Sequence, residues 1–368
     1  MSTANKQRIL FVSDHGYLPE RTGGREVSTH ELSLQLTSAG HHVAVLVRER
    51  ARLIDRVISL MASMKASPRS LFAPIRSRSH WQPGYRIYRS RNVESAMTDL
   101  IARGSYDFAV LQFDSPHRKI DFQASVADRY VVYIRDAEGV HEMDADSFPA
   151  HVPLITNSTF AARKLTARTG REVSMLIPYV EKDRYATSRG GRFVTFINPV
   201  PKKGVELAIQ IAMSCPEIPF LFVEGWPQSR VARHRLAQRL AAVPNITLRR
   251  SVIDMRQIYS QTRVLLVPSQ WEESWARVVT EGHFSGIPVL ASDTGGLRES
   301  VGRGGILIPL SDPVDRWAAD LRQLYMHSDL YEEFSARARD QAQAYWMKAQ
   351  SLPSALLECC GGTTREIR

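Results

Sequence analysis

Short apolar runs alternate with amphipathic stretches along the whole chain. The first run, residues 8–13 (RILFVS), keeps a continuous apolar centre and therefore predicts a buried strand. A polar loop containing Gly23-Gly24 follows, and then a helical pattern that ends near Ser38. Further runs of this kind predict strands at residues 85–89, 107–112, 130–134, 152–156 and 173–177. Because these runs do not alternate apolar with polar residues, they favour a parallel sheet covered by helices on both faces.

The same pattern restarts after a polar segment at residues 178–191, which ends in two glycines and is typical of a linker. After Pro313 the pattern is helical, with a long amphipathic stretch at residues 331–346. Between these points the pattern predicts strands at residues 193–197, 219–223, 246–249 and 264–267, and helices at residues 204–213, 228–242 and 255–261. We therefore expect an α/β protein with two doubly wound domains.

Composition agrees with this organisation. A length of 368 residues is usual for two domains, and 43% hydrophobic with 23% charged residues is ordinary for a globular chain. The N-terminal apolar run is too short for a signal peptide, and no stretch approaches the roughly 20 apolar residues of a membrane span. The three cysteines lack metal-ligand spacing. These features predict a cytoplasmic protein without a metal site.

Positive charge is concentrated in one segment of the first half. The segment from Arg48 to Arg103 holds twelve Lys or Arg and four Asp or Glu, whereas the whole chain has a net charge of +10. We expect an anionic partner and exclude nucleic acid, since no zinc finger or RNA-recognition signature is visible. Met61, Phe72 and Trp81 lie among the arginines and leave two interpretations open. The segment is either a surface loop of solvated charge, or a flap that contacts an anionic or lipid-linked acceptor or, peripherally, the inner face of the membrane.

The candidate chemistry is concentrated in one stretch of the second half. Two carboxylates, Glu273 and Glu281, are separated by seven residues. The sequence predicts a helix that Ser274 caps, that begins at Trp275 and that stops at Gly286. Its first turn would offer unpaired backbone N–H groups to a phosphate. Glu273 would then suit sugar hydroxyls and Glu281 a pair of ribose hydroxyls, so each part of a nucleoside-diphosphate sugar has a place.

This stretch resembles the donor-site signature of family 4 of the retaining glycosyltransferases, which have the GT-B fold. That signature is a Pro-Ser, a Glu, seven residues, a second Glu, a Gly-x-Pro-Val and a Gly-Gly-x-x-Glu. Its elements occur here in register, as Pro268-Ser269, Glu273, Glu281, Gly286-Ile287-Pro288-Val289 and Gly295-Gly296-Leu297-Arg298-Glu299. The alternative interpretation of the two carboxylates is an exposed helix with an Arg277–Glu281 ion pair, although Arg before Glu is the less favourable order for such a pair.

The resemblance covers nearly the whole chain and implies a nucleotide-sugar donor, UDP- or GDP-linked, with no cofactor and no metal. It implies two Rossmann-like domains that face each other across a cleft. Their bounds would be residues 1–179 on the acceptor side, a linker at 180–191, the donor domain at 192–343, a helix at 344–360 that crosses back, and a tail at 361–368. Lys203 matches the lysine that meets the donor diphosphate, and Glu273 matches the carboxylate beside the reacting sugar. The other donor-binding positions implied are Gly23, Gly24, Lys202, Ser251, Val252, Trp275, Ala276, Arg277 and Glu281.

Two positions depart from the family pattern. Asp114, at the end of a predicted strand, stands near the place of a histidine beside the reacting centre, and it is the third predicted catalytic residue. Asn198 stands where many members have an arginine that binds phosphate, a charge that Arg277 could supply instead. Arg135-Asp136, after the next predicted strand, is placed like Asp114 at an end that suits a binding crevice, but we expect the two residues to form an internal ion pair. The retaining hexosyl transfer that the resemblance implies has two alternatives: a nucleotide-sugar epimerase of the same architecture, and an inactive subunit that binds a nucleotide sugar.

Overall fold

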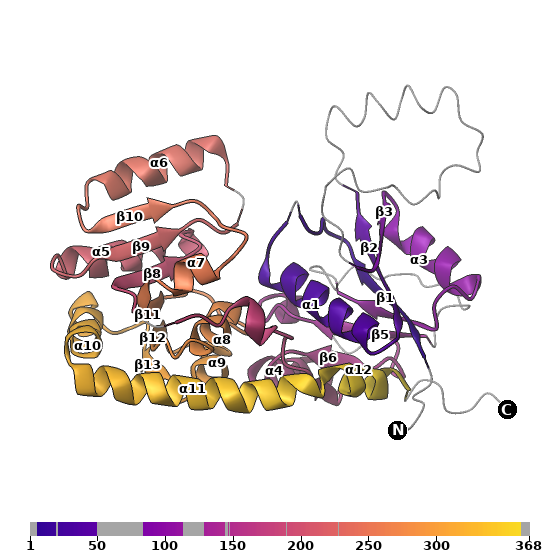
Figure 1. Cartoon of the computed structure of the whole chain (residues 1–368). Helices are drawn as coiled ribbons and strands as arrows, with labels where there is room; N and C mark the ends of the chain where they lie inside the picture. Colours follow the sequence, from indigo (N-terminus) through magenta and orange to yellow (C-terminus); the bar gives the residue numbers. More distant parts are fainter. Residues whose placement is uncertain are drawn as a thin grey trace.

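The computed structural model describes residues 6–19, 21–49, 84–112, 129–143, 146, 148–188, 190–226 and 228–361. Within these residues the chain forms two α/β domains, each built on one parallel sheet, and Figure 1 shows them side by side above a long helical segment. This confirms the predicted fold class. Asp114 and most of the basic segment lie outside the described residues. No helix of the described residues is both long and apolar enough to span a bilayer.

The first domain has a seven-stranded sheet in the order β3-β2-β1-β4-β5-β6-β7. Its strands are β1 (Arg8–Ser13), β2 (His42–Arg48), β3 (Arg86–Ser90), β4 (Phe108–Leu111), β5 (Tyr130–Ile134), β6 (Leu154–Thr156) and β7 (Val173–Met175), and its helices are α1 (Gly24–Ser38), α3 (Val93–Ala102) and α4 (Thr159–Thr169). Every side chain of β4 and β5 is buried, as expected for apolar runs that are covered on both faces. Ser158 caps α4 by accepting the Ala161 N–H.

The second domain has a six-stranded parallel sheet in the order β10-β9-β8-β11-β12-β13. Its strands are β8 (Phe193–Ile197), β9 (Phe220–Val223), β10 (Ile246–Arg249), β11 (Thr262–Val267), β12 (Val289–Ser292) and β13 (Gly305–Ile308), and its helices are α5 (Val205–Ser214), α6 (Arg230–Ala241), α7 (Arg256–Tyr259), α8 (Arg277–His283), α9 (Leu297–Val301) and α10 (Val314–Met326). Trp317 on α10 is fully buried in its core. The sequence analysis did not identify β13, whose short apolar run follows two glycines.

The chain then returns to the first domain. Helix α11 (Ser328–Gln350) runs beneath the second domain, and α12 (Leu352–Gly361) packs against α1 and β5 (Figure 1). The predicted crossing helix is therefore two helices, because Pro353 lacks the N–H needed to continue α11 and starts α12 instead. Tyr345 on α11 is buried, and its hydroxyl donates to the Pro178 carbonyl between the domains.

In both sheets the strand order reverses at one point, between β1 and β4 in the first domain and between β8 and β11 in the second. Ligands of parallel α/β proteins bind beyond the carboxyl ends of the strands at such a point. Gly23 follows β1, Lys203 follows β8 and Glu273 follows β11. The fold thus places residues of both halves of the predicted site at the two switch points.

Candidate active site

Lys203 and Glu273 are brought together at the switch point of the second sheet. The Lys203 ammonium forms a salt bridge with Glu273 Oε1, and the two side chains are 18% and 5% exposed. The Ser269 hydroxyl donates to the same carboxylate oxygen at 2.7 Å. Two of the three predicted catalytic residues are therefore in direct contact, although they are 70 positions apart in the sequence.

Glycines of the motif allow this contact. Gly204 has φ +82°, and a Cβ there would overlap the Pro268 carbonyl, so the turn after Lys203 packs directly on the loop that carries Glu273. Gly296 N donates to the Glu273 carbonyl at 2.6 Å. A Cβ at Gly295 or Gly296 would overlap the backbone of Glu273 or Ser274. The Lys-Gly and Gly-Gly pairs thus hold the side chains of Lys203 and Glu273 at a common place.

Two tryptophans that the sequence analysis did not single out as site residues enclose Lys203. The Lys203 Nζ lies 5.2 Å from the Trp226 ring centroid and 5.0 Å from that of Trp271. The two rings meet edge to face, with centroids 6.0 Å apart. Trp271 lies inside the motif and Trp226 follows the carboxyl end of β9. Their positions in the sequence could therefore have identified them as site residues. Lys202 is more exposed, and its Nζ pairs with Glu138 at 2.7 Å.

Asn198 holds the loop that carries Trp226. Its backbone has φ +68°, and its side-chain oxygen accepts the Trp226 N–H at 2.9 Å. A Cβ added at Gly225 would lie 2.9 Å from the Asn198 Cβ, so the two loops are tightly packed. The residue that stands where many family members have arginine therefore has a structural role here.

The Gly23-Gly24 loop lies against the second domain. Gly23 is the N-cap residue of α1, and Gly24 begins the helix. A Cβ at Gly24 would lie 3.3 Å from Arg277 Cδ, and a Cβ at Gly23 would lie 4.0 Å from Trp226 Nε1. The glycine loop of the first domain thus meets the elements that carry the predicted donor-binding residues.

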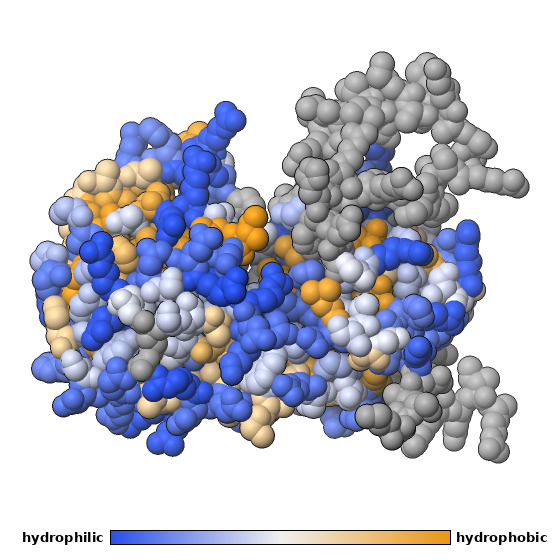
Figure 2. Space-filling view, in the orientation of Figure 1, coloured by the Kyte–Doolittle hydropathy of each residue, from blue (hydrophilic) through white to orange (hydrophobic). Residues whose placement is uncertain are grey.

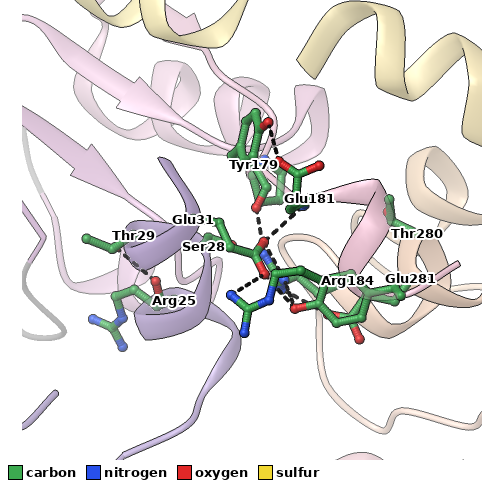
Figure 3. A network of polar contacts seen from close by, with 12 residues as sticks. Arg25, Ser28, Thr29, Glu31, Tyr179, Glu181, Arg184, Thr280 and Glu281 are labelled. Atoms are coloured by element: carbon green, nitrogen blue, oxygen red, sulfur yellow. Dashed lines mark hydrogen bonds and ion pairs between the residues drawn. The ribbon is translucent and has the colours of Figure 1, made fainter. Parts of the chain in front are cut away.

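Figure 3 shows Ser28, Glu31, Tyr179 and Glu281 in a buried polar network between the domains. Arg277 joins these residues. Its Nε donates to Glu281 Oε1 at 3.1 Å, and its Nη2 lies 3.0 Å from Glu31 Oε2 on α1. The remaining N–H groups donate to Ser28 Oγ, the Tyr179 carbonyl and the Tyr185 hydroxyl at 2.6–2.9 Å. All five N–H groups of the guanidinium are therefore used within the protein, and none is left for a phosphate.

This network also surrounds Glu281. The second oxygen of its carboxylate accepts the Tyr259 hydroxyl at 2.6 Å. Burial raises the pKa of Glu281 above its ordinary value, although Arg277 and Tyr259 favour the ionised form. Burial alone would lower the pKa of Arg277, but Glu31, Tyr185 and Glu281 hold it well above its ordinary value. The Arg277–Glu281 pair considered in the sequence analysis forms, but in the interior and not on an exposed helix.

The predicted start of the motif helix is wrong. Helix α8 begins at Arg277 with Ala276 as its N-cap residue, and no side chain caps it. The Ser274 hydroxyl donates instead to Asn157 Oδ1 of the first domain. Trp275 stacks near Tyr345 of α11, with centroids 5.8 Å apart, and its Nε1 donates to Thr280. Contacts with the other domain and with α11 therefore replace the local cap.

The other predicted donor residues lie further along the same edge. Ser251 is exposed after β10, and Val252 packs on the cluster of Leu221, Val223 and Ile258. Arg135 and Asp136 do not form the expected ion pair, since Asp136 accepts the Glu138 N–H and no described carboxylate lies within ion-pair distance of Arg135. The binding roles of these positions stay predictions.

The domains are closed on each other at this edge. Glu299, the last residue of the motif, accepts the Thr159 and Phe160 N–H groups at 2.7 Å each and so caps α4 from the other domain. Lys164 of α4 pairs with Glu272. Figure 2 shows the two lobes in contact below a recess, with hydrophobic residues at its border. The Lys203–Glu273 pair therefore lies at a junction that both domains form.

Residues 192–327 match the family model described as Glycosyl transferases group 1. The match covers the second domain and less than half of the chain. A D-inositol 3-phosphate glycosyltransferase of Streptomyces bingchenggensis is 33% identical over 121 residues, which cover 32% of this chain and 26% of the relative. A protein of the same name from Corynebacterium kroppenstedtii is 24% identical over 413 aligned positions, 94% of this chain and 88% of the relative.

Solved structures agree with this assignment. The Anabaena protein HepE, crystallised with UDP-glucose, superposes with a TM-score of 0.70 at 14% identity, over 96% of this chain and the whole of that one. At this identity the likeness concerns the fold, which is GT-B. The second domain is thus similar to group 1 glycosyl transferases, and the whole chain has the GT-B fold.

Proposed function

We propose that this protein transfers a sugar from a nucleoside-diphosphate sugar to an acceptor hydroxyl, with retention of anomeric configuration and without a metal ion. The observation that carries the proposal is the Lys203–Glu273 pair at the β8/β11 switch point, beside the glycine loop of the first domain. The complex of HepE with UDP-glucose supports a nucleotide-sugar donor. The name shared by the two relatives supports an acceptor that carries phosphate.

The leaving group is the nucleoside diphosphate, and Lys203 is the cation placed to meet it. A fixed positive charge at a leaving oxygen is worth more where water is excluded, and the rings of Trp226 and Trp271 shield part of the ammonium. When a phosphate binds Lys203, the Ser269 hydroxyl keeps Glu273 in place. Glu273 then faces the positively charged sugar, and the acceptor hydroxyl attacks on the side from which the diphosphate leaves.

The nucleoside end of the donor extends along the second domain. Glu281 supplies the acceptor oxygens for the ribose hydroxyls, and Arg277 with Tyr259 fixes the orientation of its carboxylate. Arg277 therefore acts on the donor through Glu281 and not through a phosphate. Ser251 and Val252, which follow β10, would contact the base.

The test is product analysis with purified protein, a panel of UDP- and GDP-linked sugars, and EDTA. Slow hydrolysis or transfer that releases the nucleoside diphosphate and keeps the anomer of the donor, read by NMR, is the expected result. Glu273→Gln is the matched variant, because it keeps the Ser269 contact and removes the charge. A changed sugar still attached to its nucleotide would indicate the epimerase, and binding without any product would indicate the inactive subunit.

A further inference from the structure

Arg135 is held at the crevice edge of the first domain by one side of its guanidinium. It directly follows β5, which pairs with β4 next to the switch point. Its Nη1 donates to the Arg25 carbonyl at 3.1 Å and to Thr29 Oγ1 at 3.2 Å, both on α1. The carbon at the centre of the guanidinium lies 4.1 Å from the Tyr133 ring centroid. These contacts fix the plane of the group.

The opposite edge of the same guanidinium is open. Arg135 Nε is buried and has no hydrogen-bond partner, and its Nη2 makes no hydrogen bond with the described residues. Burial lowers the pKa of Arg135; the charges of Arg25 and Arg277 act in the same direction, and Tyr133 and Glu26 act against it. No described carboxylate pairs directly with the guanidinium, and a desolvated cation with unused N–H groups is costly, which makes this edge a candidate site for an anion.

Two other buried or partly buried arginines, Arg277 and Arg171, have structural roles, and their N–H groups can be compared with those of Arg135. Arg277 uses all five N–H groups inside the protein, as described above. Arg171, which precedes β7 at the opposite edge of the first sheet, donates to the carbonyls of Phe148, Ala150 and Val152. Arg135 differs from both because the Nε–Nη2 side, the fork that grips carboxylate and phosphate bidentately, is unused.

Polar groups of α1 and of the end of β4 lie next to Arg135. Thr29 Oγ1, which accepts from Arg135, donates to Gln112 Oε1 at 2.9 Å, and Gln112 directly follows β4. Ser13, Arg25, Glu26, Thr29 and Gln112 line a cavity between β1, β4 and α1. Glu26 pairs with Arg21 at 3.1 Å. Figure 3 shows the Arg25 side chain directed away from Glu31 and Arg184, so the two sides of α1 carry separate polar groups.

We propose that the Nε–Nη2 edge of Arg135 binds the anionic group of the acceptor, a phosphate monoester. This rests on the proposed function, and it assigns the anion to the acceptor because Arg135 belongs to the first domain whereas the donor diphosphate has Lys203 of the second. An oxyanion there would add a directly paired counter-charge and be fixed by two parallel N–H···O bonds. The acceptor hydroxyl would then be oriented from its phosphate end.

Binding of inorganic phosphate tests this without turnover. We compare wild type, Arg135→Met, Arg135→Lys and the control Arg171→Met by calorimetry, first with UDP or GDP alone and then with phosphate in the presence of saturating nucleotide. Arg135→Met should lower phosphate affinity at least tenfold and leave nucleotide affinity within twofold. Arg135→Lys keeps the charge without the planar fork of N–H groups, so its phosphate affinity should lie between those of wild type and Arg135→Met. Arg171→Met should lower the melting temperature but not the phosphate affinity.

Two results would overturn the proposal. Unchanged phosphate affinity in both Arg135 variants would mean that no anion site exists there. An equal loss of nucleotide and phosphate affinity would mean that Arg135 serves the donor diphosphate. Both readouts stay valid if the protein transfers no sugar, so failure of this proposal is distinguishable from failure of the proposed function. If Arg135→Met does not fold, Arg135→Lys carries the same comparison.

Discussion

Replacing Arg277 by methionine should destabilise the protein strongly, because Met keeps the apolar stem and removes a buried charge. Its removal leaves two carboxylates of the interior without their cation, Glu31 with a side chain 0% exposed and Glu281 with one 8% exposed. Breaking a buried ion pair from one side costs about 3–5 kcal/mol. Arg184, 3.3 Å from Glu31, is 42% exposed and compensates only a small part.

The control is Arg298→Met in the same domain. Arg298 also pairs with a carboxylate, that of Asp293, but its side chain is 67% exposed, so its loss should change the stability very little. Both variants are measured by urea-induced unfolding. Adding Glu31→Gln to Arg277→Met removes the stranded charge and should recover part of the deficit. Equal unfolding midpoints for Arg277→Met and Arg298→Met would refute the reasoning, since the network would then contribute no more than a surface pair.

The deficit of Arg277→Met should also depend on pH. The pKa of Glu281 in the folded protein already lies above its ordinary value, so the folded state holds its proton to higher pH than the unfolded state. Stability therefore falls as the pH rises through that interval. Removal of Arg277 takes away a charge that lowers the pKa of Glu281 in the folded protein. The pH interval between its unfolded and folded pKa values therefore becomes wider. The difference between variant and wild type should grow from acidic to neutral pH, and a constant difference would contradict this.

Three further predictions concern the site and its support. Lys203→Ala should reduce turnover about 100-fold or more, measured as sugar release from the donor, while Lys202→Ala should do less, because Lys202 pairs with Glu138 away from Glu273. Glu281→Ala should weaken nucleoside-diphosphate binding by about 1–3 kcal/mol in calorimetry, whereas Glu273→Ala should leave that affinity nearly unchanged. Burial lowers the pKa of His283 to about 4, so the unfolded chain binds more protons below its ordinary value and stability is lost as the pH falls through that window. Between pH 7 and 5 this loss should be roughly 2 kcal/mol in wild type and be absent from the matching comparison in His283→Phe.

The sequence was sufficient where function follows from short motifs. Unbroken apolar runs predicted the two parallel sheets, and the spacing of the motif identified Lys203 and Glu273, which the structure brings into contact. Their contact depends on glycines of the same motifs, so short local patterns were enough to predict a contact between distant residues. The helix start at Trp275 could not be predicted in this way, because Ser274 and Trp275 bind Asn157 and Tyr345 from distant parts of the chain.

Electrostatic roles were the part that the sequence could not supply. Arg277 is a plausible phosphate ligand when only its neighbours in the chain are known, but its partners Ser28 and Glu31 come from positions 249 and 246 residues away. Arg135 has a carboxylate next to it in the sequence, which favours an ion pair that does not form among the described residues. In both cases the side-chain partner is decided by tertiary packing and not by spacing.

What distinguishes these arginines is how many of their N–H groups the protein itself uses. Arg277 and Arg171 donate hydrogen bonds to oxygens of the protein, and an incoming anion would have to break these hydrogen bonds to bind either residue. Arg135 is anchored through Nη1 alone, so an anion gains two hydrogen bonds and displaces none. The cost of keeping that edge unpaired in the empty protein is then recovered on binding, which favours anions over neutral acceptors of the same shape. A phosphorylated acceptor and its dephosphorylated form should therefore differ in KM in wild type, and the difference should largely disappear in Arg135→Met.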